Sequence, residues 1–193
     1  MTFIPNDSHG QSQYQVRFDW GAAGAATIAV GADVVVLVDV IGEDRPRLSE
    51  SPVLEALAGI PAVVVAGSLR NRTAVARWAV ERQGDKGERF TVAVVAAGAV
   101  RSDDSIRFAL EDLLGAGAIV DALAEVGIDY CSPEAAAAAA AFTGLRNATG
   151  HLIGASASGR ELTANGQRAD VDFAIEIDAS DSIDILREFT SRA

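Results

Sequence analysis

Residues 34–40 have the sequence VVVLVDV, a short and continuous run dominated by β-branched side chains. Such a run is typical of a strand whose two faces are both covered by helices, as in parallel or mixed sheets. Similar runs follow at 62–66 (AVVVA) and 91–96 (TVAVVA). These two runs are followed by Gly67 and Gly98, and glycine lets the chain turn sharply over the carboxyl edge of a sheet. The three runs predict three buried strands.

Helical patterns separate and follow these strands, and alanine, the best helix former, is frequent in them. The expected helices span residues 20–30, 52–58, 71–83, 105–126 and 133–145. Because strands and helices alternate along the chain, the sequence predicts an α/β fold with a mixed or parallel β-sheet flanked by layers of helices.

The two ends of the chain are less regular. Residues 1–13 are rich in turn-forming and amide side chains and predict a flexible lead-in, followed by one domain over residues 14–193. Residues 14–18 and 171–177 alternate apolar and polar side chains, which predicts a strand at each place, and residues 182–189 predict a closing helix.

The composition excludes several classes of function. A formal net charge of −11 repels nucleic acid and anionic membrane surfaces. No stretch reaches the roughly 20 apolar residues of a membrane-spanning helix. The single cysteine, Cys131, excludes an internal disulfide and fits a reducing cytoplasm best. We expect a homodimer only because two-fold dimers are the commonest oligomers.

One candidate site lies where the strand at 62–66 passes into the next helix. Free amides at the helix start, the Ser68 hydroxyl, the Arg70 guanidinium and Asn71 can together contact one phosphate or sulfonate. Alternatively, Ser68 and Asn71 only cap the helix while Arg70 covers its flank. The sequence leaves both interpretations open.

Three acidic residues form a second candidate site. Glu111 and Asp112 are adjacent within a helix, where neighbouring side chains point about 100° apart, so at least one faces inward. An inward carboxylate needs a partner, and Mg²⁺ or an arginine is the natural one. Asp39 ends an apolar strand at the edge where open α/β sheets bind ligands, although a bond to loop amides explains it equally well.

Two further arginines are candidates for binding an anionic substrate. Arg101 lies in the polar turn after the strand at 91–96, and Arg160 lies in the turn-rich segment 156–172. In that segment the sequence does not distinguish substrate contacts from loop capping.

Several of these segments, in this order, resemble the 2-phosphosulfolactate phosphatase family. The resemblance covers roughly residues 15–187, and its most specific parts are the LRN and LEDxxGAG pieces. The matching segments are VVVLVDV (34–40), AGSLRNRTAVA (66–76), AAG (96–98), ALEDLLGAGAIVDAL (109–123) and SGRELTANGQRADV (158–171).

The resemblance implies an Mg²⁺-dependent hydrolase of phosphate monoesters that acts on a small phosphorylated sulfonate or hydroxy acid, on a layered fold. It implies that Asp39 and Glu111 are catalytic and that both, together with Asp112, are available to hold Mg²⁺. The residues expected to bind the anionic substrate are Ser68, Arg70, Asn71, Arg101 and Arg160.

The sequence departs from the family pattern in two places. Residues 41–45 (IGEDR) replace a hydroxyl-rich helix start, and Ile60-Pro61-Ala62 replaces an Asn-Gly-Thr-like loop. Two functions therefore stay open. In one, the protein is a phosphatase that rebuilds its phosphate cradle from Arg45, Ser49 and residues 66–72. In the other, it is a catalytically degenerate relative that acts as an anion-binding or oligomer-forming protein.

Overall fold

A computed structural model describes residues 8–41, 48, 51–101, 103 and 105–188, apart from the side chains of Ser8 and Val100. Its main sheet has five strands in the order β1-β4-β2-β3-β7. These are β1 (Val16–Trp20), β4 (Val92–Ala96), β2 (Val34–Val38), β3 (Val63–Gly67) and β7 (Ile185–Arg187). The first four are parallel and β7 is antiparallel to β3, so the predicted α/β fold with a mixed sheet is confirmed.

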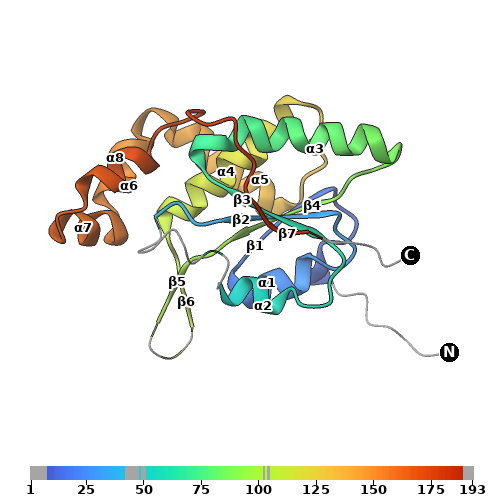
Figure 1. Cartoon of the computed structure of the whole chain (residues 1–193), viewed down its shortest axis with the longest axis horizontal. Coiled ribbons are helices and arrows are strands. Elements are labelled where there is room, and N and C mark those ends of the chain that lie inside the picture. The colour runs from blue at the N-terminus through green and yellow to red at the C-terminus, as the bar shows by residue number, and fades with distance from the viewer. Residues whose placement is uncertain (1–7, 42–47, 49–50, 102, 104, 189–193) are drawn as a thin grey trace.

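Helices cover both faces of the sheet (Figure 1). One face carries α1 (Gly21–Ile28) and α2 (Pro52–Ala56). The other carries α3 (Arg72–Lys86), α4 (Leu110–Glu125) and α5 (Pro133–Leu145). The sequence expectation for α5 matches these bounds, because Ser132 caps its start by accepting a hydrogen bond from the Ala135 N–H at 3.1 Å.

The central strand shows why the sequence runs are continuously apolar. Val34, Val36 and Val38 of β2 belong to the core cluster beneath α3, α4 and α5. Val35 and Leu37 belong to the cluster beneath α1 and α2. Since alternate side chains of a strand point to opposite faces, a strand covered on both faces needs an apolar residue at every position.

Several short elements extend beyond the sheet. They are β5 (Ala99–Val100), β6 (Ile106–Arg107), α6 (Thr149–Ala155), α7 (Ala157–Ala164), α8 (Arg168–Ala174) and the 3₁₀ turns η1 (Ser8–Gly10), η3 (Leu69–Asn71) and η4 (Arg146–Ala148). The β5–β6 hairpin leaves the sheet on the side of α1 and α2, whereas α6, α7 and α8 lie on the side of α3 to α5 (Figure 1).

The predicted strand at 171–177 is wrong, because most of this segment lies in or directly after α8. Val171 and Ala174 are buried, three residues apart on one helical face, while Phe173 is 41% exposed. The alternating apolar pattern therefore also satisfied helical spacing, and packing decided between the two.

The predicted helix at 182–189 is also wrong, because the chain there forms β7. Val64 and Val65 of β3 pair with Arg187 and Ile185, so β7 covers what would otherwise be a free edge of the sheet. The helix expected from residue 105 begins only at Leu110, since residues 106–107 pair with residues 99–100 in the hairpin.

The described part of the predicted lead-in contacts the opposite edge of the sheet. Gln11 is 5% exposed. Its side-chain amide accepts a hydrogen bond from the Phe18 N–H at 3.0 Å and donates one to the Phe18 carbonyl at 2.9 Å. The Gln11 side chain thus satisfies the N–H and carbonyl groups of Phe18, as a neighbouring strand would.

Candidate active site at the carboxyl edge of the sheet

Asp39, Glu111 and Asp112 come from two elements that meet at the carboxyl edge of the sheet. Asp39 directly follows β2, and Glu111 and Asp112 lie in the first turn of α4. Acidic side chains favour this position, because the amino end of a helix carries partial positive charge. Glu111 and Asp112 are each 3% exposed, and Asp39 is half-buried.

The carboxylate of Asp112 joins the ends of two neighbouring strands. One oxygen accepts a hydrogen bond from the Val40 N–H at 2.9 Å, just beyond β2. The other accepts one from the Gly98 N–H at 2.9 Å, just beyond β4. We call this pair of bonds the Asp112 clamp.

The negative charges of Asp39 and Glu111 both act on Asp112. Burial, reinforced by the negative charges of Asp39 and Glu111, raises the pKa of Asp112 well above its ordinary value. The hydrogen bonds from Val40 and Gly98 act in the opposite direction. Because the negative charges of these carboxyl groups repel one another, a cation placed among them would be stabilised.

The donor set at this edge suits a divalent cation of the Mg²⁺ type. Glu111 is buried and Asp39 is half-buried, and both offer the carboxylate oxygens that this cation prefers. Mg²⁺ commonly takes only one or two carboxylates and completes its shell with water and phosphate oxygens. Within the described ranges, however, no three His, Cys, Asp or Glu side chains form a ready cation site.

Ser68 and Asn71 lie together in the turn between β3 and α3, where their polar atoms bond to the chain itself. The Asn71 side-chain oxygen accepts from the Ser68 N–H at 2.9 Å, and the Ser68 hydroxyl accepts from the Arg70 N–H at 3.2 Å. The Asn71 amide donates to the carbonyls of Ala66 and Ser182 at 3.1 and 3.3 Å. These contacts match the capping alternative, and whether either residue also contacts an anion stays a prediction.

Arg70 lies against the C-terminal helices. Its guanidinium forms an ion pair with Glu176, donates to the Phe173 carbonyl at 2.9 Å and lies 3.5 Å above the centre of the Phe173 ring. The predicted role of Arg70 in substrate binding therefore requires that this contact to α8 be exchanged for one to the substrate.

The other two predicted arginines lie on separate projections. Arg101 is exposed in the hairpin and donates to the Ile106 carbonyl at 3.0 Å. Arg160 is exposed on α7. No contact among the described residues gathers Arg70, Arg101 and Arg160 into one cluster.

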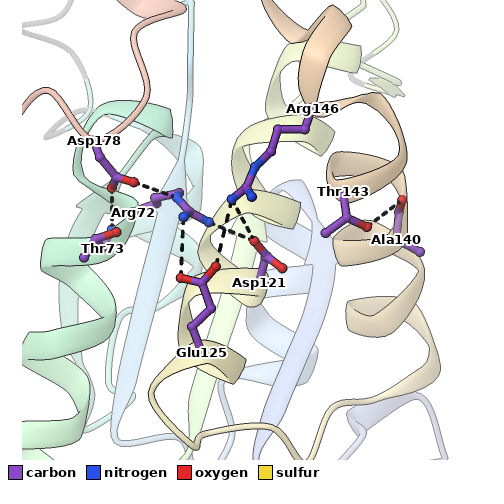
Figure 2. Close-up of polar contacts among 8 residues, drawn as sticks. All are labelled: Arg72, Thr73, Asp121, Glu125, Ala140, Thr143, Arg146 and Asp178. Atoms are coloured by element: carbon purple, nitrogen blue, oxygen red, sulfur yellow. Dashed lines mark hydrogen bonds and ion pairs between the residues drawn. The ribbon is translucent and has the colours of Figure 1, made fainter.

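Sequence reasoning missed a charged cluster centred on Arg72 (Figure 2). Arg72 is 6% exposed and bonds to Asp121 at 2.8 Å, Asp178 at 2.9 Å and Glu125 at 3.5 Å. Arg146 also contacts Asp121, at 3.3 Å. Burial opposes the charge of Arg72, but the neighbouring carboxylates outweigh it and raise its pKa. The cluster ties α3, α4, η4 and the C-terminal segment together.

A signal for this cluster exists in the sequence. Asp121 interrupts an apolar stretch of α4 between Val120 and Ala122, and an acid in such a place needs a cation partner. The partner is Arg72, two residues after the arginine that the sequence analysis selected.

Comparison with known protein families gives one match. A family model described as 2-phosphosulpholactate phosphatase matches residues 51–188. The matched range contains Glu111 and Asp112, whereas Asp39 precedes it. A search of individually curated proteins gives no match. None of the helices in the described residues is long and apolar enough to span a membrane.

Proposed function

The chain belongs to the 2-phosphosulpholactate phosphatase family, and we propose that it hydrolyses a small phosphate monoester at the carboxyl edge of its sheet. The proposed substrate is a phosphorylated sulfonate or hydroxy acid, and the proposed cofactor is Mg²⁺. One observation supports this location most strongly: buried Glu111 and Asp112 lie beside Asp39 where β2 and β4 end. Open α/β sheets bind their ligands at this edge.

In this proposal Asp39 and Glu111 hold the metal ion, and Asp39 also accepts the proton of the attacking water. Asp39 suits that second role because it is half-buried and therefore reachable by water, whereas Glu111 is 3% exposed. Mg²⁺, when bound, offsets negative charge on the phosphoryl oxygens.

The reaction balances without any further reactant. The water oxygen forms a new bond to phosphorus, the bond between phosphorus and the ester oxygen breaks, and the ester oxygen leaves as an alcohol after protonation. The protein's contribution is to orient the water and the phosphoryl group in line.

The charge of the whole chain supports a cation-assisted site. At a formal net charge of −11, the protein repels a dianionic phosphate ester over a long range. The arginines nearest in sequence to the proposed cradle, Arg70 and Arg72, are both engaged by carboxylates. Because Arg70 and Arg72 are paired with carboxylates, a bound metal ion would supply the positive charge that attracts the phosphate group.

The test measures release of inorganic phosphate by the purified full chain. The substrates are 2-phosphosulfolactate and 2-phospholactate, each assayed with MgCl₂ and with a chelator. We expect turnover that the chelator abolishes. Asp39→Asn and Glu111→Gln should lower kcat by about 100-fold or more, in line with loss of a catalytic carboxylate.

Matched controls carry the same chemical change on exposed acids. Asp129→Asn and Glu161→Gln alter exposed side chains and should keep wild-type kcat. Absence of phosphate release from both substrates refutes the proposal. In that case the degenerate reading gains support, because the polar atoms of Ser68, Arg70 and Asn71 are already bonded within the chain.

A further inference from the structure

We infer that Asp112 is a positioning residue, which fixes Asp39 and Glu111 relative to each other and is not itself a metal ligand. The inference rests on the proposed function and refines the metal-binding role that the sequence suggested for Asp112. The Asp112 clamp, formed by hydrogen bonds from the Val40 and Gly98 amides, carries the argument.

The clamp begins where the pairing of β2 with β4 stops. The last registered pair of these strands is Val38 with Ala96, and the next backbone bond runs from the Ala97 N–H to the Val38 carbonyl at 2.8 Å. Beyond it, the Asp112 carboxylate accepts the N–H groups of Val40 and Gly98. A side chain of α4 thus replaces the strand partners that these two amides lack.

Hydrogen bonds hold the backbone on both sides of Asp39, and the one on the C-terminal side belongs to the Asp112 clamp. The preceding residue, Val38, bonds through its carbonyl to Ala97, and the following residue, Val40, bonds through its N–H to Asp112. Glu111 directly precedes Asp112 in the first turn of α4. The bond between Val40 and Asp112 therefore sets the position of Glu111 relative to Asp39.

A glycine brings the helix close enough for this contact. A Cβ atom added to Gly115, one turn after Glu111, would lie 2.5 Å from a methyl carbon of Val40 and 2.9 Å from one of Val38. Only a residue without a side chain lets α4 approach β2 so closely. The close approach of α4 and the two bonds of Asp112 act on the same residues around Asp39.

The contacts of Asp112 also distinguish it from a metal ligand. Both of its oxygens accept backbone N–H groups, so the carboxylate is aligned with the two strand ends. Glu111 is equally buried and directly precedes Asp112 in the first turn of α4, so the orientation of Asp112 also orients Glu111. Residues that orient metal ligands typically change metal affinity or activity by about 10–100-fold when they are replaced.

The first test compares Asp112→Asn with the wild-type chain by amide hydrogen exchange, without metal or substrate. An amide side chain replaces one of the two acceptor oxygens by an NH₂ donor, so the N–H group that faced that oxygen loses its acceptor. We expect slow exchange at Val40 and Gly98 in the wild type and fast exchange at one of them in the variant. Unchanged protection of both amides would overturn the clamp.

The second test separates positioning from ligation by titrating MgCl₂ in a calorimeter. Asp112→Asn should bind Mg²⁺ about 10–100-fold more weakly, whereas Glu111→Gln should show no binding. The kcat of Asp112→Asn should also fall by about 10–100-fold, with KM nearly unchanged. Loss of Mg²⁺ binding as complete as in Glu111→Gln would show that Asp112 is a ligand, and unchanged binding and kcat would show that the clamp does not serve the site.

A conservative variant covers the case in which Asp112→Asn fails to fold. Asp112→Glu keeps two acceptor oxygens and should fold, with protected Val40 and Gly98 amides and partial kcat. Wild-type kcat together with rapid exchange of both amides would refute the inference. A wild-type chain without phosphatase activity would instead refute the proposed function, while the exchange comparison still decides whether the clamp exists.

Discussion

Asp178 connects the C-terminal segment to the first turn of α3. One of its oxygens accepts from the Thr73 N–H at 3.0 Å, and the other accepts from Arg72 at 2.9 Å. Burial opposes ionisation of Asp178, but the bonds from Thr73 and Arg72 outweigh it and lower its pKa below the ordinary value. The ionised form of Asp178 therefore stabilises the fold.

Replacing Asp178 by Asn removes the charge and keeps an acceptor for Thr73. We expect a loss of about 1 kcal/mol in the free energy of unfolding at pH 7, a modest value because the side chain is 34% exposed and screened by water. Since the pKa is lower in the folded than in the unfolded chain, the stabilisation is present above pH ~3.9 and disappears as the pH falls through the folded value.

Urea unfolding of both chains at pH 7 and pH 3 measures this effect. The difference between wild type and Asp178→Asn should shrink on acidification. A difference of equal size at both pH values would show that the charge of Asp178 is not responsible.

At the scale of single residues, the sequence predicted which acidic side chains are buried better than it predicted their hydrogen-bond or ion-pair partners. The expectation that at least one of Glu111 and Asp112 faces inward is confirmed, since both are 3% exposed. The expected partner was a metal ion or an arginine, whereas the recorded partners of Asp112 are two backbone amides. An apolar pattern reveals which charge is buried, but the partner depends on residues distant in the chain.

At the scale of the elements, two glycines of the GAG sequence let α4 pack closely against its neighbours. Gly115 faces β2, and Gly117 faces α5, where an added Cβ would lie 2.1 Å from the Ala138 carbonyl oxygen. Backbone atoms cannot move aside as a flexible side chain can. The LEDxxGAG piece that identifies the family thus has a structural reason, because the glycines let α4 pack closely between the sheet and α5.

Gly117→Ala should therefore destabilise the protein. Overpacking a close contact costs about 1–3 kcal/mol, which here outweighs the better helix propensity of alanine. Gly84→Ala, in α3, is the matched control because an added Cβ there meets nothing within 4 Å. It should leave stability unchanged or raise it by up to about 1 kcal/mol. Thermal unfolding of both variants tests this, and equal midpoints would contradict the packing argument.

The long elements were predictable from sequence and the short ones near the C-terminus were not. Strands β2, β3 and β4 were predictable from continuous β-branched runs, which occur because both faces of the sheet are covered. By contrast, β7 has three residues, and its strand conformation depends on pairing with Val64 and Val65 of β3. Residues 171–174 satisfied both strand and helix spacing, and packing around Val171 selected the helix.

Across the whole molecule, the sheet topology brings Asp39 and α4 to one edge. Strands β2 and β4 are neighbours although 53 residues, 39–91, lie between them in the chain. The sequence suggested that distant acids converge at the carboxyl edge, and the effect of Asp39 and Glu111 on the pKa of Asp112 supports this arrangement. Arg45 and Ser49, proposed to rebuild the phosphate cradle, lie outside the described residues.

The carboxyl edge also has projections on either side. The β5–β6 hairpin carries Arg101 and α7 carries Arg160, and these two elements lie towards opposite layers of the fold (Figure 1). An anionic substrate that required both arginines would have to draw the two elements together. We therefore propose that catalysis depends on Asp39 and Glu111 and not on Arg101 and Arg160 together.

A crystal structure of the chain with MgCl₂ and inorganic phosphate tests the central claim most directly. We predict a cation about 2.0–2.1 Å from oxygens of Asp39 and Glu111, with phosphate bound to it at the carboxyl edge of β2 and β4. Asp112 should keep its bonds to Val40 and Gly98. A cation or phosphate bound elsewhere, with Asp39 and Glu111 contacting neither, would contradict the proposed active site.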